Sequence, residues 1–312
     1  MIFMKPNFWQ TKNFISLLLF PLTLITFSIN FLKKFNIKNH FKIKTICIGN
    51  LNAGGTGKTS LAVELNELLN AKFKTVFIKK KYSNQKDEYN LLKKRGKIIS
   101  SKNRIDALKN AEKNFDLAIL DDGLQQKNIE YDLKIVCINS YEGFGNNFLL
   151  PAGPLRENSN ELKNYDIVFL NGFKKNQKLK NKIKKVNNSL KIFDAIYEPT
   201  NLKKYNLKNK FLFFCGIGNP HEFENTLNKF KFKIKEKFIF PDHYSMSDEI
   251  INNMKDIANK NKFNIITTEK DFLRLTKKQQ KGINFLKVKL KIKNINKLKK
   301  IIKSNLLKKL TI

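Results

Sequence analysis

Short apolar runs alternate with amphipathic stretches along most of this chain. The apolar runs have the continuous hydrophobic character of strands buried on both faces of a parallel sheet. The stretches at 60–69 and 103–114 repeat their hydrophobic residues at helical spacing. This alternation predicts an α/β fold with a doubly wound parallel sheet that binds ligands at the carboxyl ends of its strands. The predicted strands are 43–48, 73–80, 96–100, 116–120, 133–139 and 165–170.

A second, smaller α/β domain is predicted beyond residue 200. The pattern thins over Tyr197–Leu207, which contains Pro199, and we place the boundary there. We therefore expect an N-terminal segment (1–40), a large domain (41–200) and a smaller domain (201–312). In the smaller domain we predict strands at 210–215, 233–240 and 264–267, helices at 220–230 and 248–260, and a lysine-rich amphipathic helix, exposed to solvent, at 294–310.

The front of the chain holds an uncharged apolar run, Phe14–Phe31, with lysines on both sides. Its 18 residues are at the short end of what spans a bilayer, roughly 17–25 residues. Pro21 predicts a kink inside it. The run is therefore either a short span, with the flanking lysines placing the rest in the cytoplasm, or a kinked helix lying in one leaflet. A buried core helix is the alternative, but we favour a membrane-associated helix.

Composition adds an extreme charge, with 61 Lys+Arg against 26 Asp+Glu, or +35 at pH 7. Lysine far outnumbers arginine and is spread from end to end, which favours compositional drift, with an anionic membrane surface as a second contributor. Nucleic-acid binding would need a clustered basic face with stacking aromatics, so no nucleic-acid partner is expected. The three cysteines lie in apolar runs without metal-ligand spacing, and we interpret them as buried small hydrophobes.

A glycine-rich turn, Gly54–Thr59, joins the first predicted strand to the helix at 60–69 and reads Gly-Gly-Thr-Gly-Lys-Thr. Glycines let backbone N–H groups approach phosphate, the lysine reaches the β- and γ-phosphates, and the threonine hydroxyl binds Mg²⁺. Asn52 stands where the strict pattern has glycine, so an ordinary Gly-rich turn is the alternative, but the flanking strand and helix favour a nucleotide site. The predicted nucleotide-binding residues are Asn52, Ala53, Gly54, Gly55, Thr56, Gly57, Lys58, Thr59 and Ser60.

The apolar run 116–120 ends in Asp121-Asp122-Gly123. A carboxylate at the end of a buried strand, following a phosphate-binding loop, orders Mg²⁺ or its water. Alone, Asp-Asp-Gly is as often a turn signal. We predict a Mg²⁺ site formed by Thr59 with Asp121 or Asp122, and the sequence does not choose between the two aspartates.

Taken together, these motifs resemble the tetraacyldisaccharide 4′-kinase family, the lipid A 4′-kinases of Gram-negative bacteria. The resemblance implies transfer of the ATP γ-phosphate to the 4′-hydroxyl of an acylated glucosamine disaccharide 1-phosphate, giving lipid IV A. It also implies Mg²⁺, an N-terminal membrane-associated helix at the cytoplasmic face of the inner membrane, and two α/β domains that close on the nucleotide. Its most specific segments are Gly49–Ala53, Leu120–Gln125, Phe144–Asn146, Leu150–Glu157 and Phe240–His243.

The resemblance also implies catalytic roles. Asp87 corresponds to the base for the sugar hydroxyl, His243 to its partner, and Glu88 to a second carboxylate beside the metal. Lys58 serves the phosphate cradle. Arg156 stands out because arginine is scarce here and its guanidinium suits bidentate phosphate or substrate contact, and Arg104 is a further candidate.

The chain departs from the family around the predicted base. The family's Ser-Arg-Gly-Tyr segment is Lys79-Lys80-Lys81-Tyr82 here. In addition, Lys86 and Tyr89 replace the glycine and proline that flank the two carboxylates, Asp87 and Glu88. An alternative function is a membrane-attached P-loop ATPase that switches other proteins without a small-molecule acceptor. That reading leaves Leu150–Glu157 and Phe240–His243 without a role.

Overall fold

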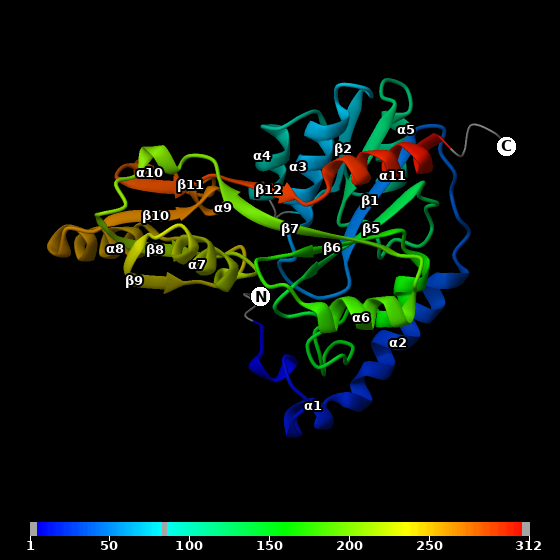
Figure 1. The fold of residues 1–312 in the computed structure, drawn as a ribbon, viewed down its shortest axis with the longest axis horizontal. Helices are drawn as coiled ribbons and strands as arrows, with labels where there is room; N and C mark the ends of the chain where they lie inside the picture. Colours follow the sequence, from blue (N-terminus) through cyan, green and yellow to red (C-terminus); the bar gives the residue numbers. More distant parts are fainter. Residues whose placement is uncertain (1–4, 83–85, 308–312) are drawn as a thin grey trace. The chain divides into compact units, whose positions relative to one another are not determined.

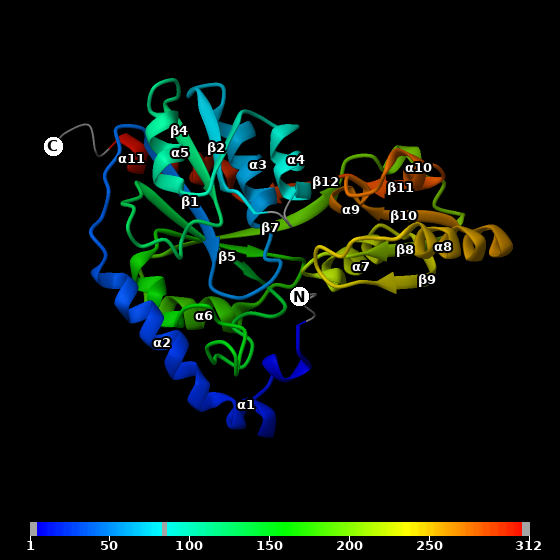
Figure 2. The same cartoon turned by 180° about the vertical axis from the view of Figure 1, so that it is seen from behind.

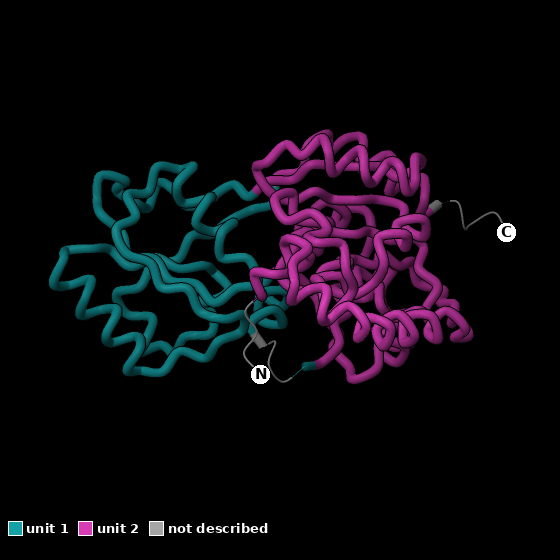
Figure 3. The backbone as a smooth tube through the Cα atoms, turned by 90° about the horizontal axis from the view of Figure 1, so that it is seen from below, with its two compact units in different colours: residues 1–4, 82–94, 197–290 teal, residues 5–81, 95–196, 291–312 magenta. Residues whose placement is uncertain are grey.

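A computed structural model describes residues 5–82 and 86–307 (Figure 1). The described chain divides into two compact units, coloured separately in Figure 3. Unit 1 comprises residues 82, 86–94 and 197–290, and unit 2 comprises 5–81, 95–196 and 291–307. The sequence analysis placed 86–94 in the large domain and 291–307 in the small one, whereas they belong to units 1 and 2 respectively. The limits predicted for the domains, 1–40, 41–200 and 201–312, remain a prediction.

Unit 2 is built on an eight-stranded sheet of order β12-β7-β6-β5-β1-β4-β2-β3. The pairings from β7 to β3 are all parallel, which confirms the predicted α/β fold. The central strand β1 is buried along almost its whole length, as its apolar run predicts. The strands are β1 (Lys44–Asn50), β2 (Thr75–Lys80), β3 (Ile98–Ser101), β4 (Leu117–Asp121), β5 (Leu133–Asn139), β6 (Ile167–Asn171), β7 (Lys191–Pro199) and β12 (Val288–Ile292).

Helices cover both faces of this sheet (Figures 1 and 2). Helices α5 (Arg104–Ala111) and α6 (Gln177–Val186), with the 3₁₀ turn η4 (Ser159–Asn164), pack on the face that carries Cys47. Helix α3 (Lys58–Leu69) packs against β1 and β4, and α11 (Ile295–Leu307) against β5. The predicted tail helix thus buries its apolar stripe instead of standing in solvent, and its predicted residues 308–310 lie outside the described chain.

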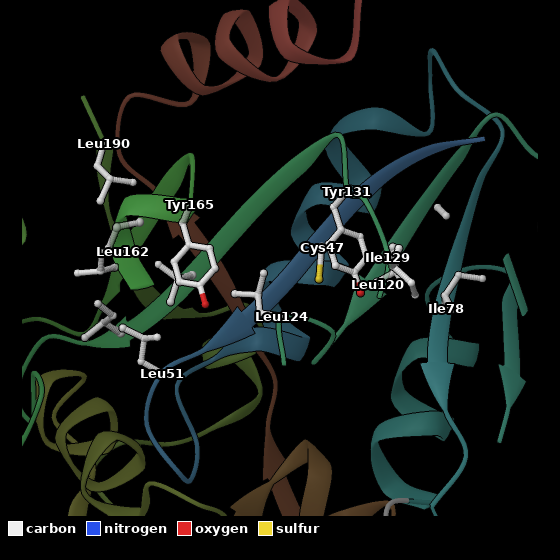
Figure 4. Close-up of a cluster of buried hydrophobic side chains, with 14 of the residues drawn as sticks. Cys47, Leu51, Ile78, Leu120, Leu124, Ile129, Tyr131, Leu162, Tyr165 and Leu190 are labelled. Atoms are coloured by element: carbon white, nitrogen blue, oxygen red, sulfur yellow. The ribbon is translucent and has the colours of Figure 1, made fainter. Parts of the chain in front are cut away.

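The segment after β4 packs tightly on the sheet (Figure 4). A Cβ on Gly123 would lie 2.7 Å from Cys47 Sγ, so only glycine fits there without a shift. The Tyr131 hydroxyl donates to the Gly123 carbonyl at 3.1 Å. Cys47 and the other two cysteines are buried and free, as predicted. Burial raises the pKa of the Cys47 thiol to about 12, which leaves it an inert packing group.

The N-terminal segment belongs to unit 2 and is broken at Pro21, as predicted. It forms η1 (Asn7–Trp9), α1 (Phe14–Leu18), η2 (Phe20–Leu22), α2 (Thr23–Leu32) and η3 (Lys33–Phe35). Among the described residues, none of the helices is both long and apolar enough to cross a membrane. Most of the large apolar side chains between Phe14 and Ile37 are exposed, so this is not the buried core helix considered as the alternative.

Unit 1 holds a four-stranded parallel sheet of order β11-β10-β8-β9. Successive side chains of β8 point to opposite faces of this sheet. Phe211 and Phe213 face a core formed with α7, and Leu212 and Phe214 face a second core formed with α8, so this sheet is also covered on both faces. The elements are β8 (Lys210–Cys215), β9 (Lys233–Ile239), β10 (Asn264–Thr268), β11 (Ile283–Leu286), α4 (Lys86–Lys93), α7 (Pro220–Lys229), α8 (Asp248–Asn261), α9 (Glu269–Phe272), α10 (Lys277–Gln280) and the 3₁₀ turn η5 (Leu202–Lys204).

Several elements are absent from the sequence prediction. Helix α4 lies in a stretch that we interpreted as polar loop, and α6, β7, α9, α10, β11 and β12 were not predicted at all. In α6 and β12 the apolar residues are separated by lysines, and β11 and α9 span only four residues each, so their local sequence signal is weak. The missing α4 matters most, because it carries Asp87 and Glu88.

Candidate functional site

The glycine-rich loop of unit 2 has the backbone of a phosphate cradle. Gly54 and Gly57 adopt φ angles of 101° and 84°, which side chains with a Cβ rarely tolerate. Gly57 is also the N-cap of α3, so Lys58 and Thr59 begin the helix whose positive end faces the loop. The arrangement suits an anion bound by backbone N–H groups.

Two asparagines hold the carbonyl side of this loop. Asn50, the last residue of β1, donates from its side-chain amide to the carbonyls of Asn52 and Gly54. Asn171, the last residue of β6, donates to the carbonyl of Thr56. Three alternate carbonyls of the loop therefore have side-chain partners. The predicted nucleotide-binding residue Asn52 contributes differently, because its amide donates to the Gly143 carbonyl at 2.9 Å.

Asp121 lies at the end of β4 beside the loop and is 1% exposed. Its Oδ2 accepts a hydrogen bond from the Thr59 hydroxyl at 3.1 Å and a charged hydrogen bond from Lys79 Nζ at 2.9 Å. Its Oδ1 is buried and, within the described chain, accepts no hydrogen bond. The structure thus brings the predicted Thr59 and Asp121 together and adds Lys79, which the sequence analysis noted only as a departure from the family pattern.

Asp122 turns away from the strand with a φ of 59° and faces a group of cations. Arg156 Nη1 lies 3.3 Å and Lys58 Nζ 3.6 Å from its Oδ1. Burial alone would raise the pKa of the Asp122 carboxyl, but Lys58, Arg156 and further cations outweigh burial and lower it to about 2. Asp122 therefore remains ionised and holds two of the predicted phosphate-binding side chains in place.

Arg104 supports this turn from α5. Its Nη2 donates to the Asp122 carbonyl at 2.7 Å and its Nη1 to Gln126 Oε1 at 3.2 Å. The side chain is 6% exposed. These contacts engage both terminal nitrogens of the guanidinium with the protein itself, so Arg104 supports the Asp122 turn.

The loop and the Asp121 side chain fit a Mg²⁺-nucleotide. Mg²⁺ prefers hydroxyl and carboxylate oxygens and, in nucleotide sites, takes one or two carboxylates plus phosphate oxygens. The hydroxyl of Thr59 and the unpartnered Oδ1 of Asp121 supply such a set. Within the described ranges, no group of three or more His, Cys, Asp or Glu side chains is close enough to hold a metal without a ligand's oxygens.

Unit 1 carries Asp87, the predicted catalytic base, and His243, its predicted partner. Asp87, in the first turn of α4, lies with its Oδ1 3.2 Å from His243 Nδ1 and is 4% exposed. Burial alone would raise the pKa of the Asp87 carboxyl, but the hydrogen bond with His243 and the charges of Lys270 and Arg274 outweigh burial and hold the pKa well below its usual range. The carboxylate is therefore ionised at physiological pH and has an imidazole against one oxygen.

Two cations of the α9 region complete this cluster. Arg274 Nη2 donates to Asp87 Oδ2 at 2.8 Å, and Lys270 Nζ lies 3.4 Å from the same oxygen. Lys270 also donates to Glu88 Oε1 at 3.0 Å. Burial alone would lower the pKa of the Lys270 ammonium, but Glu88, Asp242 and Asp87 outweigh burial and raise it. Glu88, predicted beside the metal, is thus engaged with Lys270 within unit 1.

The turn after β8 joins the parts of the cluster. The Gly216 carbonyl accepts hydrogen bonds from Arg274 Nη1 at 2.7 Å and from the His243 backbone N–H at 3.2 Å. The Gly216 N–H donates to Asp271 Oδ2 at 3.1 Å, and Arg274 Nη1 donates to Asp271 Oδ1 at 2.7 Å. His243 itself has a φ of 61°. Asp271 and Arg274 thereby fix the backbone that presents His243.

The sequence analysis named Asp87 and His243 but missed Arg274. A signal was present, since Arg274 is one of only four arginines in the sequence. What the sequence could not show is that one guanidinium bridges α4 and the turn at Gly216.

Comparison with known proteins finds relatives along nearly the whole chain. A model of the tetraacyldisaccharide-1-P 4′-kinase family matches residues 15–307. A tetraacyldisaccharide 4′-kinase from Pelagibacter ubique is 44% identical over 96% of this chain and 98% of its own length. One from Rickettsia akari is 36% identical over 86% of this chain and 87% of its own.

Among solved structures, LpxK from Aquifex aeolicus in complex with ATP is similar in fold, with a TM-score of 0.70 and 23% identity. The match covers 94% of this chain and 99% of that one. Since the family match spans nearly the whole chain and includes both the phosphate cradle of unit 2 and the Asp87–His243 pair of unit 1, the chain belongs to the tetraacyldisaccharide-1-P 4′-kinase family.

Proposed function

We propose that this protein transfers the γ-phosphate of ATP to the 4′-hydroxyl of tetraacyldisaccharide 1-phosphate, a step of lipid A biosynthesis that gives lipid IV A. Family membership supports the reaction and the substrate class. The observation that carries the proposal is the Asp87–His243 pair at 3.2 Å, since a P-loop ATPase that only switches other proteins has no use for a base directed at a sugar hydroxyl.

In unit 2, we assign the phosphates to the loop from Asn52 to Ser60. Its N–H groups and the Lys58 ammonium would bind the β- and γ-phosphates, and Arg156 would neutralise charge that develops during transfer. Thr59 and Asp121 would hold Mg²⁺, which would offset the negative charge of the phosphates. Between the two aspartates we choose Asp121 as the direct ligand, because it has the unpartnered buried oxygen and Asp122 is occupied by cations.

In unit 1, Asp87 would accept the proton of the 4′-hydroxyl with His243 as its partner. The cations around Asp87 keep it ionised and also weaken it as a base. A weak base suits a phosphoryl transfer with a loose transition state, in which the attacking hydroxyl loses its proton only as the phosphoryl group arrives. We assign Glu88 to the metal side of the substrate, as the family resemblance implies.

We further propose that the N-terminal segment lies in the cytoplasmic leaflet of the inner membrane. Of the exposed large hydrophobic residues in the described chain, all but Tyr82 and Tyr141 lie between Phe14 and Ile37. Such a concentration of exposed apolar side chains in one segment suits insertion into one leaflet, where an acylated substrate resides. Replacing Phe14 and Leu18 together by Ser is expected to reduce co-sedimentation with anionic phospholipid vesicles, and unchanged sedimentation would contradict the assignment.

The test of the kinase function is transfer of ³²P from γ-labelled ATP to tetraacyldisaccharide 1-phosphate in detergent micelles, with and without Mg²⁺. Labelled lipid that depends on both Mg²⁺ and the acceptor would support the proposal. ATP hydrolysis without labelled lipid would favour the ATPase switch instead. The Asp87→Asn variant is the matched control, since it should bind ATP and yet label the lipid roughly 100-fold more slowly.

A further inference from the structure

Lys79 is a buried cation that the family motifs leave without a role. It occupies the second-last position of β2 and is 3% exposed. The last described pairing of β2 with β4 is Ile78 with Leu120, so Lys79 and Asp121 come next on the two adjacent parallel strands. Their side chains meet at 2.9 Å. The family segment that this chain resembles has serine at the corresponding place, whereas this sequence has a lysine there.

Burying a lysine is costly unless a carboxylate pairs with it. Lys79 is therefore held in place by Asp121, and it in turn occupies Oδ2 of that residue together with the Thr59 hydroxyl. The remaining oxygen, Oδ1, is buried and accepts no hydrogen bond within the described residues. Lys79 thus fixes which carboxylate oxygen is available to a ligand.

We propose that Lys79 is a built-in counter-ion of the phosphate site, which orients Asp121 and lessens the dependence of ATP binding on Mg²⁺. This inference rests on the nucleotide binding proposed above. Lys79 lies on the carboxylate opposite the oxygen assigned to the metal, so its charge repels a divalent cation there. The same charge attracts the phosphates of a nucleotide that arrives without metal.

Two effects of opposite sign follow. Removing the charge of Lys79 should strengthen the binding of Mg²⁺ in the nucleotide complex and weaken the binding of metal-free ATP. A merely structural role would behave differently, because loosening Asp121 or the loop would weaken both. The pair of effects therefore separates a counter-ion from a packing residue.

The experiment measures equilibrium binding of the non-hydrolysable analogue AMP-PNP to full-length Lys79→Met by calorimetry, in EDTA and over a Mg²⁺ titration. We expect the Mg²⁺ concentration for half-maximal binding to fall roughly tenfold and the affinity in EDTA to fall roughly tenfold. Lys81→Met is the matched control, since Lys81 is exposed and two residues away.

A second variant, Lys79→Gln, keeps a hydrogen-bond donor for Asp121 while removing the charge, and serves if the Met variant does not fold. The same opposite shifts in Lys79→Gln would support the counter-ion role. Unchanged Mg²⁺ dependence, or weaker binding both with and without Mg²⁺, would overturn it while leaving the kinase function intact. A wild-type chain that binds no AMP-PNP in either condition would overturn both proposals.

Discussion

The two units build their polar sites in different ways. In unit 2, Thr59, Asp121 and Asp122 come from two contiguous motifs, and each aspartate is matched with its own cations. In unit 1, one carboxylate, Asp87, is contacted by three groups from separate segments, namely His243, Lys270 and Arg274. The comparison teaches that the core of the proposed phosphate site lies in two short motifs, whereas the surroundings of the proposed base come from distant parts of the chain.

The largest effect is expected in unit 2. Lys58→Ala removes the charge that we assign to the phosphates and that lies 3.6 Å from Asp122, and we expect transfer to fall roughly 100- to 1,000-fold. Rates of labelled-lipid formation, together with AMP-PNP binding, measure the loss. Wild-type rates in this variant would remove Lys58 from the site.

Replacing Asp87, the proposed base of unit 1, should slow transfer almost as much, but through the attack of the hydroxyl and not through phosphate binding. Asp87→Asn keeps the shape and removes the acceptor charge, so we expect transfer to fall roughly 100-fold. ATP binding should stay within about twofold of the wild type, because the phosphate site is unchanged. If Asp87 and His243 act as a pair, adding His243→Ala to Asp87→Asn should cause little further loss. Full additivity of the two losses would contradict the pairing.

Arg274 offers a sharper test of how unit 1 is assembled. Arg274→Lys keeps the charge but loses the fork that contacts Asp87, Asp271 and the Gly216 carbonyl together. We expect kcat to fall roughly tenfold, with the KM for ATP unchanged, since Arg274 acts through the position of Asp87 and His243. Steady-state kinetics in both substrates provide the measurement. A kcat equal to that of the wild type would show that charge alone suffices.

The smallest effect concerns stability in unit 2. Gly123→Ala places a Cβ within 2.7 Å of Cys47 Sγ, and we expect the free energy of unfolding to fall by roughly 1–3 kcal/mol. Cys47→Ala makes room for the new methyl group, so it should recover much of this loss in the double variant. Thermal or urea unfolding of the four proteins measures the coupling. Additive losses would show that the contact with Cys47 is not the cause.

The same contrast explains what could be predicted from the sequence. The strands around β1, the loop at Gly54–Thr59 and the Asp121 turn were predicted correctly, because continuous apolar runs and local motifs carry their own signal. Helix α4 was not predicted, although it positions Asp87, since its polar, lysine-rich sequence becomes helical only through its packing.

The placement of side chains was harder to foresee. Asp87 and His243 were paired only through the family resemblance, and their distance of 3.2 Å depends on the turn at Gly216, which no local pattern reveals. Lys79 was noted as a departure, yet its burial against Asp121 needs the β2–β4 register to be known. Arg274 was missed for the same reason.

The asparagines that end β1 and β6 have a consequence for affinity. Because Asn50 and Asn171 restrain the loop's carbonyls, the loop takes its shape during folding and not when a nucleotide arrives. Ordering a loop residue costs about 1–2 kcal/mol in conformational entropy. That entropy is lost once, when the chain folds, so the nucleotide's contacts contribute their full free energy to binding.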